Sequence, residues 1–373
     1  MVRLWFYYIR SVFISNTPWV LLEVKLPREI TKSPKAMEVV VNIFFQTFDG
    51  NGLDRIFRGF VKSWFSLEMV SIAGDVRFFV RTPKFHRNLV EAQIYSQYPE
   101  VELYEVEDYV NNIPSYGTPN SGWSIWGTEY KLSKEDAYPI KTYVDYGMDD
   151  NPKEEHKVDP MTPVLEFLGS IGPSEQVWIQ ILVMATIKRF HKPGSWFKKV
   201  DWRDGAKALL EKLALRDKVR KPGEFPTIRT PGEEEVLKSV ERSLSKVAFD
   251  CGMRAVYLAK PEVYNPSRVV GLLSSIRQYG SLNLNGFSAT NRTSIEYPWQ
   301  DWRGIRLEEM KRTIFDAYRR RSWFHPPHKR RPFVLNAEEL ATIYHFPSSV
   351  ASTPTLKRIQ SKRAEPPVDL PVG

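Results

Sequence analysis

The densest group of chemically active side chains lies in the stretch Tyr318–Pro332, YRRRSWFHPPHKRRP, where six arginines or lysines alternate with histidines and aromatic residues. Guanidinium and ammonium groups neutralise phosphates, and aromatic rings stack on bases or lie among lipid headgroups. The candidate contacts to DNA or to another anionic surface are Arg319, Arg320, Arg321, Trp323, Lys329, Arg330 and Arg331. The alternative is a solvated helix end, where positive charge complements the helix dipole.

The distribution of charge along the chain is uneven. The 373 residues carry a net charge of +9. From Glu100 to Asp159 there are 14 acidic and 5 basic residues, whereas from Arg303 to Arg331 there are 10 basic and 3 acidic ones. This segregation predicts either a charged partner surface, including the acidic region of a neighbouring subunit, or docking of one region of the chain on another.

Motifs for catalysis are absent from the sequence. It contains no G-x-x-x-x-G-K-[ST], H-E-x-x-H, paired C-x-x-C or G-x-S-x-G. His325 and His328 flank two prolines, but no further metal ligands lie nearby. The single cysteine, Cys251, is expected in the core of a strand. We therefore predict a non-enzymatic protein with no cofactor and no metal.

Residues 18–110 predict a first ferredoxin-like unit of α+β class, because strand and helix patterns follow in the order βαββαβ. Gly74-Asp75 indicates a hairpin between its second and third strands. The acid-rich last strand places Glu105, Glu107 and Asp108 on a solvated face. The expected elements are Pro18–Pro27, Ser33–Phe48, Trp64–Gly74, Asp75–Pro83, Pro83–Pro99 and Glu100–Tyr109.

Residues 123–292 repeat the same order of patterns and predict a second ferredoxin-like unit. Its central hairpin contains a helical insertion at 188–248, a position where insertions are tolerated because the strand ends already lie close together. The expected elements are Trp123–Leu132 with Tyr138–Gly147 extending the same edge, Asp159–Ile171, Glu175–Ile187, Asp250–Lys260, Asn265–Gly280 and Ser281–Thr290.

The N-terminal segment, residues 1–17, is rich in aromatic and aliphatic side chains. Arg3 and Arg10 interrupt it, and it is shorter than the roughly 20 residues that span a bilayer. We expect either contact with a membrane interface or an edge element packed on the domain.

A C-terminal helical region at 293–350 is expected to begin with a helix at Ile305–Phe324 and to end with a small capped helix. Asn336 is a good N-cap, and Glu339 completes a capping box. The side chains that should face inward and make this a docking helix are Leu340, Ile343 and Tyr344. Residues 351–373 are predicted to form an extended arm.

Three stretches together resemble a known family: Leu21–Val40, Tyr138–Val183 with its YPIKTYVDYG and DPMTPVLEFLGSI motifs, and FVLNAEELATIYHFPSS followed by TPTLKRIQSKRAEPP. They are similar to the non-ATPase region preceding the motor domain in conjugative DNA-transfer, or type IV secretion coupling, ATPases of candidate-phyla bacteria. This chain departs from that family in lacking clear upstream membrane spans and in ending before any motor domain. It is therefore expected to be either a free-standing subunit or a fragment.

The resemblance implies a module at the cytoplasmic face of the cell membrane, or in the cytoplasm, that partners a RecA-like translocation ATPase. It also implies a homo-oligomer within the complex and contact with the membrane surface. The predicted function is accordingly assembly and tethering of the ATPase. The alternative is a DNA-binding protein that uses the basic patch 319–331, whose affinity for DNA would fall steeply with salt.

Overall fold

The computed structural model describes residues 2–27, 32–48, 50–114, 122–149, 158–186, 190–191, 199–215 and 230–347, and shows an α+β protein. Its centre is a nine-stranded antiparallel sheet. The strands are β1 (Trp19–Lys25), β2 (Phe65–Ile72), β3 (Asp75–Pro83), β4 (Glu102–Val106), β5 (Ser124–Leu132), β6 (Glu175–Ala185), β9 (Ala248–Ala259), β10 (Phe287–Thr290) and β11 (Phe333–Asn336). A separate small hairpin pairs β7 (Phe190–His191) with β8 (Lys199–Val200).

The strand order in the sheet is β10-β5-β9-β6-β2-β3-β1-β4. Strands from the first part of the chain therefore lie at one end and strands from the second part at the other, joined where β2 pairs with β6. One edge of β9 is paired with β6 from Phe249 to Ala259. Its other edge is shared, since β5 pairs with the later residues of β9 and β11 with the earlier ones.

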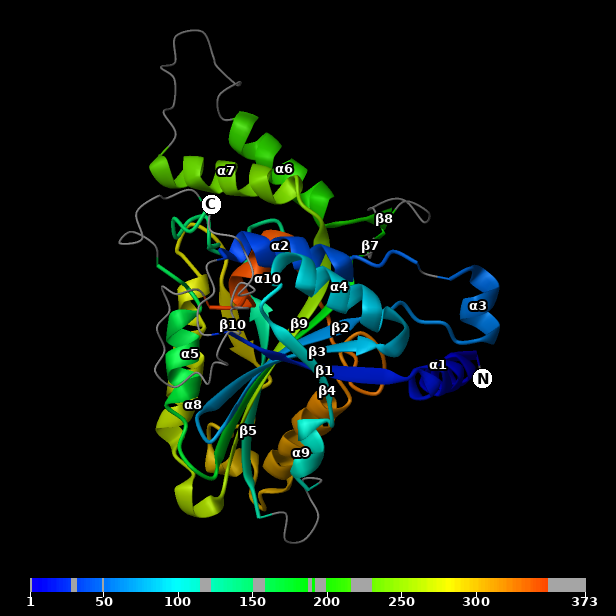
Figure 1. Cartoon of the computed structure of the whole chain (residues 1–373), viewed down its shortest axis with the longest axis vertical. Coiled ribbons are helices and arrows are strands. Elements are labelled where there is room, and N and C mark those ends of the chain that lie inside the picture. The colour runs from blue at the N-terminus through cyan, green and yellow to red at the C-terminus, as the bar shows by residue number, and fades with distance from the viewer. Residues whose placement is uncertain are drawn as a thin grey trace, which may run out of the picture.

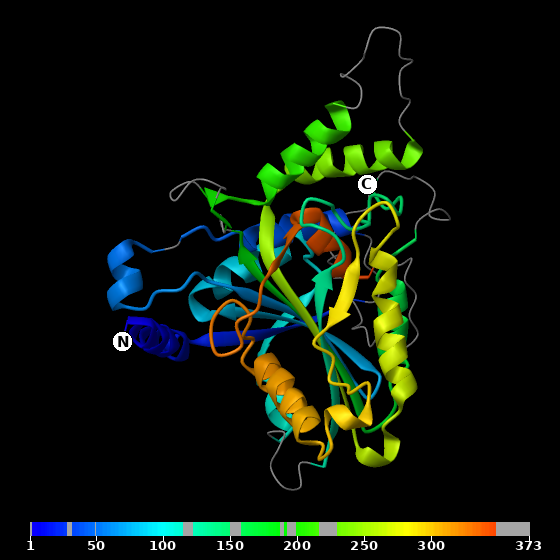
Figure 2. The ribbon, with the colours of Figure 1, turned by 180° about the vertical axis from the view of Figure 1, so that it is seen from behind.

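Helices cover both faces of the sheet (Figures 1 and 2). The helices are α1 (Val2–Asn16), α2 (Pro34–Val41), α3 (Gly52–Phe57), α4 (Arg87–Gln97), α5 (Thr162–Gly169), α6 (Trp202–Leu215), α7 (Pro231–Leu244), α8 (Pro266–Ser275), α9 (Ile305–Arg319) and α10 (Ala337–Ile343). One face carries α2, α4, α5, α8 and α10, and the opposite face carries α9. The pair α6–α7 lies beyond one end of the sheet, and α1 and α3 project to one side (Figure 1).

The central strands β6 and β9 are buried on both faces, so their sequences are nearly continuous apolar runs without alternation. The larger core lies between the sheet and the α2/α4/α5/α8/α10 layer. A smaller core on the α9 face is built around Trp178, with Phe315 and Tyr318 from α9 packed on it. This second core holds α9 in place, and with it the start of the arginine-rich segment.

Several sequence expectations are confirmed by these elements. The insertion contains the two expected helices, α6 and α7, and Cys251 is buried in β9. The capped helix at Asn336 forms as predicted, with the reciprocal Asn336–Glu339 bonds of a capping box. Residues 2–16 of the N-terminal segment form a helix with one buried residue, Ile9, and its contact with a membrane stays a prediction.

Other expectations were wrong. Residues 138–147 form turns instead of a strand, and α9 ends at Arg319 instead of Phe324, because Arg321 adopts a left-handed backbone with φ of 47°. Strand β11, which precedes the capped helix and joins β9, was not predicted. The predicted arm, 351–373, lies outside the described residues.

Candidate functional site: the arginine-rich segment and the apolar tip

The arginine-rich segment, Tyr318–Pro332, runs from the end of α9 to β11 and crosses the face of the sheet that α9 covers. Tyr318 and Arg321 are almost completely buried, and Ser322, Trp323 and Phe324 are buried as well. The segment is thus partly a core element, which its sequence of charged residues did not indicate.

Arg321 forms a buried ion network with Glu68 of β2 and with Asp108. Its Nε and Nη2 donate to the two carboxylate oxygens of Glu68 at 2.9 and 3.0 Å, and Nη2 also donates to Asp108 at 2.9 Å. Glu68 accepts further hydrogen bonds from Ser66, Tyr109 and Gln180. Burial alone would raise the pKa of Glu68, but Arg321 and these hydrogen bonds lower it to about 2.

Arg321 also remains charged in this network. Burial disfavours the guanidinium, but the adjacent Glu68 carboxylate raises the pKa of Arg321 well above its usual value. Both groups are therefore ionised in the folded protein. The sequence placed Asp108 on a solvated face, whereas the structure brings it to Arg321, so that part of the prediction was wrong.

Trp323 and Arg330 bind a second buried ion pair. The Trp323 ring lies over the guanidinium of Arg254, 5.0 Å from the ring centroid, and Gly252 leaves the space that the ring occupies. Glu129 of β5 lies 3.6 Å from Arg254 and accepts from Arg330 Nε at 2.9 Å. The basic segment is therefore paired with carboxylates of the acidic region of the same chain, one of the two outcomes expected from the charge segregation.

These contacts divide the predicted anionic-surface residues into two groups. Arg321 and Trp323 are 1% and 3% exposed, so their prediction as surface contacts is corrected. Arg320 and Arg330 reach the surface while paired with Asp316 and Glu129. Arg319, Lys329 and Arg331 are also partly or fully exposed.

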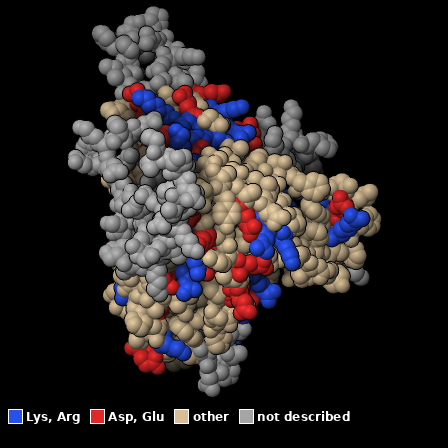
Figure 3. All heavy atoms as spheres, in the orientation of Figure 1, with Lys and Arg blue, Asp and Glu red and all other residues tan. Residues whose placement is uncertain are grey.

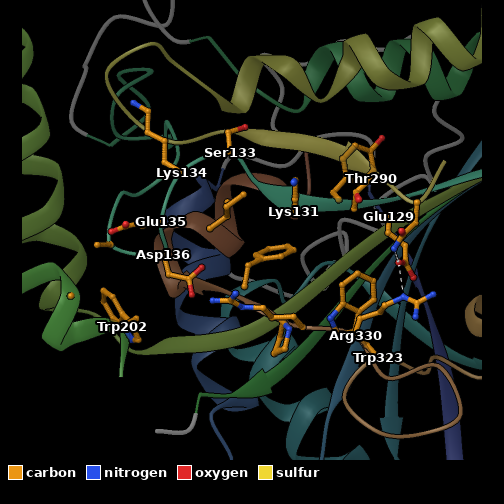
Figure 4. Close-up of a pocket in the computed structure, with 18 residues that line it drawn as sticks. Glu129, Lys131, Ser133, Lys134, Glu135, Asp136, Trp202, Thr290, Trp323 and Arg330 are labelled. Carbon is orange, nitrogen blue, oxygen red and sulfur yellow. Dashed lines mark hydrogen bonds and ion pairs between the residues drawn. The ribbon is translucent and has the colours of Figure 1, made fainter. Parts of the chain in front are cut away.

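A cleft of about 700 Å³ borders the segment beneath α6 (Figure 4). Trp202 of α6 stands at one end of it and Trp323 and Arg330 at the other. Its lining includes positively and negatively charged side chains, among them Lys131 and Arg330 and the carboxylates of Glu129 and Asp136. This mixture does not favour a strongly charged ligand of either sign.

An apolar tip is formed by α1 and α3 where they project from the sheet (Figures 1 and 3). Ile9 is the only buried residue of α1, and α3 has none. Within these helices the large apolar side chains left exposed are Val2, Leu4, Trp5, Tyr7, Tyr8, Val12, Leu53, Ile56 and Phe57. Contiguous apolar surface of this kind marks contact with a membrane or a partner.

The two helices of the apolar tip are fixed to one another. Trp5 Nε1 donates to the carbonyl of Ile56 at 3.2 Å, and the Phe13 and Phe60 rings are 5.3 Å apart. Gly59 has φ of +66°, and a Cβ there would lie 2.3 Å from the Ile9 carbonyl oxygen. Only glycine allows this close approach.

The docking helix α10 packs into the main core beside α2 (Figure 1). Leu340, Ile343 and Tyr344 are all buried, as predicted. Glu339 caps the helix and also accepts from the backbone N–H of Ile140 at 2.8 Å. Its burial raises its pKa to about 8 despite these backbone bonds. Helix α10 is therefore an integral part of the fold.

Among the described residues, no group of three or more His, Cys, Asp or Glu side chains is placed to hold a metal ion. In the same residues, no helix has both the length and the hydropathy that crossing a bilayer requires.

Comparison with protein families matches residues 15–358 to a family described as "Domain of unknown function (DUF8128)". Comparison with curated proteins gives no match.

Proposed function

The chain belongs to the DUF8128 family, and from this premise we propose that it is a non-enzymatic assembly module that tethers a RecA-like translocation ATPase at the cytoplasmic face of the membrane. The machinery concerned is of the conjugative DNA-transfer or type IV secretion kind. The module acts as a platform with two attachment points, one for the bilayer and one for the ATPase.

The observation that carries the proposal is the apolar tip. Its aromatic and aliphatic side chains come from two helices on a projection, from which they can enter the headgroup region of a bilayer. Helix α1 has no acidic residue, and the two helices together carry three arginines and one aspartate. Trp, Tyr and Arg are the residues expected at the level of anionic headgroups.

The ATPase end of the platform is proposed from the resemblance noted in the sequence and from the position of α10. Because α10 is buried and capped, it fixes the point at Pro347 from which the chain continues. In the resembling family the corresponding stretch leads into the motor domain. The part of the chain after Pro347 is therefore proposed as the attachment to the ATPase, within a homo-oligomeric complex.

We interpret the platform itself as two ferredoxin-like units joined edge to edge. In support, the strands β1 to β4 lie in the order β2-β3-β1-β4, and the strands β5, β6, β9 and β10 in the order β10-β5-β9-β6. If the four strands of each group are numbered 1 to 4 along the chain, both groups have the sheet order 4-1-3-2 when read from strand 4. In each group, helices connect strand 1 to strand 2 and strand 3 to strand 4. The β2–β6 pairing would then be the joint between units.

Direct binding of DNA is the weaker proposal. With Arg321 and Trp323 buried, it would depend on Arg319, Arg320, Lys329, Arg330 and Arg331. Arg320 is paired with Asp316 and Arg330 with Glu129. Because Arg321 is not available to contact a phosphate, both the affinity for DNA and its dependence on salt would be smaller than the sequence predicts.

Co-purification tests the ATPase partnership. Tagged full-length protein, cross-linked in its own cells, is expected to retain a Walker-motif RecA-like ATPase identified by mass spectrometry. Deletion of residues 348–373 should remove the ATPase while leaving the fold and the membrane fraction unchanged, because every described element lies before residue 348. Deletion from Phe333 is unsuitable, since it removes β11 and α10 from the core.

The matched control changes the other attachment point. Substituting Leu4→Glu and Phe57→Glu together should release the protein from membranes but leave the ATPase bound. Retention of the ATPase by the protein ending at Pro347 would contradict the proposed attachment.

A further inference from the structure

A second cavity, of about 660 Å³, lies between α1 and the arginine-rich segment. Helix α1 contributes Tyr7, Ser11, Ile14 and Ser15 to one wall, and the opposite wall is formed by residues from Asp316 to His328. Its floor includes Arg81 of β3, which the sequence did not single out.

Arg81 lacks a carboxylate partner within ion-pair distance in the described part of the chain. Its guanidinium instead lies over the Trp19 ring, 4.3 Å from the centroid. Burial and the neighbouring Arg321 lower the pKa of Arg81 to about 9, with Glu68 and Asp108 opposing this at longer range. A partly desolvated cation of this kind gains from an added anion.

His325 supplies a second polar group without a partner in the same cavity. Its Nε2 is buried and makes no hydrogen bond. Burial, with Arg10 and Lys329 nearby, lowers the pKa of His325 to about 4, so the ring is neutral at pH 7. In the tautomer protonated at Nε2, it can donate a hydrogen bond without changing the charge of the cavity.

The acidic groups around the cavity are already neutralised. Glu68 is held by Arg321, and Asp316 is bound by Arg320 at 2.8 Å and by His328 at 2.7 Å. Arg321 is shared by Glu68 and Asp108, so Arg81 balances the second of these carboxylates at longer range. Additional positive charge at the cavity comes from Arg10 and Lys329, which lie near His325. Aromatic side chains of Trp19, Trp64, Trp323 and Phe324 complete the walls.

We propose that this cavity binds the phosphate group of an anionic ligand, with Arg81 as the principal cation and His325 as a neutral donor. Tyr7 and Ser11 also line the cavity and carry hydroxyls that can donate further hydrogen bonds. The aromatic walls accommodate an organic group attached to the phosphate, so the ligand is a phosphate ester.

Two kinds of ligand carry such a phosphate group: a soluble phosphate ester, and an anionic phospholipid with the phosphate in its headgroup. The lipid source follows from the position of α1, which forms a wall of the cavity and also the exposed face of the apolar tip. Only this lipid source rests on the proposed membrane function. Binding of a soluble ester does not require it.

The test measures binding of glycerol 3-phosphate by calorimetry, to the full-length protein and two variants. Arg81→Gln should weaken binding by tenfold or more, the loss of about 1.5–3 kcal/mol expected for a charged hydrogen-bond partner. Arg77→Gln is the matched control, since Arg77 lies on the same strand and is already paired with Asp75 at 2.8 Å; it should bind as the wild type does. Ser11→Trp, which fills the cavity from α1, should also abolish binding and serves if Arg81→Gln fails to fold.

Vesicles distinguish the two sources. If a lipid headgroup is the ligand, Arg81→Gln should weaken binding to phosphatidylglycerol vesicles but not to phosphatidylcholine vesicles, and glycerol 3-phosphate should compete. Binding of glycerol 3-phosphate together with unchanged vesicle binding by Arg81→Gln assigns a soluble ester. Absence of glycerol 3-phosphate binding by the wild type, or equal binding by wild type, Arg81→Gln and Ser11→Trp, overturns the proposal, whatever the outcome for membrane tethering.

Discussion

At the scale of single residues, the arginine-rich segment shows why a cluster of cations in a sequence does not by itself define a binding surface. Arg321 has two carboxylates from distant parts of the chain around it, and a buried charge is tolerated only when it is paired and hydrogen-bonded in this way. Neighbouring Arg320 has a side chain that is 61% exposed. The two adjacent arginines should therefore differ greatly in their contribution to stability.

Replacing Arg321 with Met should lower the free energy of unfolding by about 3–5 kcal/mol, because Glu68 is left as a buried carboxylate without its cation. The double variant Glu68→Leu with Arg321→Met should be less destabilised than the single one. Arg320→Met, the control, should change stability by about 0.5 kcal/mol or less. Urea unfolding measures all three, and equal effects of Arg321→Met and Arg320→Met would contradict the ion network.

At the scale of elements, what the sequence predicted and what it missed have physical explanations. Local signals were sufficient for β6, β9, α7, α8 and α10, whose apolar runs and caps are determined within each element. Strand β11 was missed because four residues carry little pattern and its pairing with β9 is a long-range contact. Glu129, Glu68 and Arg81 were missed for the same reason, since their partners and cavity are assembled from separate elements.

The apolar tip depends on one close backbone approach, which allows a test at this scale. Gly59→Ala should displace α1, because its Cβ would lie 2.3 Å from the Ile9 carbonyl oxygen and because φ of +66° disfavours alanine by roughly 1–2 kcal/mol. Amide exchange of residues 2–16 should then accelerate by about tenfold, while exchange in β6 and β9 stays slow. Gly52→Ala is the control, as no atom lies within 4 Å of a Cβ at that position. Equal protection of α1 in both variants would show that the helix is not held by this contact.

At the scale of the whole molecule, part of the uneven charge of the sequence is satisfied within the fold. Arg321 and Arg330 of the basic region pair with Asp108 and Glu129 of the acidic region. This internal docking joins α9 and its following segment to β2, to β5 and to Asp108 after β4. The apolar tip is a group of large apolar side chains that the described residues leave exposed, and the account of this protein as a membrane-tethered platform depends on that tip.

Co-flotation with vesicles tests this claim most directly. The full-length protein should float with vesicles of phosphatidylcholine and phosphatidylglycerol in equal amounts. Leu4→Glu with Phe57→Glu should weaken binding by roughly tenfold or more per residue, from the loss of about 1.5–3 kcal/mol for each buried apolar side chain. Leu282→Glu, at a residue that is 98% exposed away from the tip, should bind as the wild type does. Failure of the wild-type protein to float, or equal flotation of the tip and Leu282 variants, would contradict membrane tethering by α1 and α3.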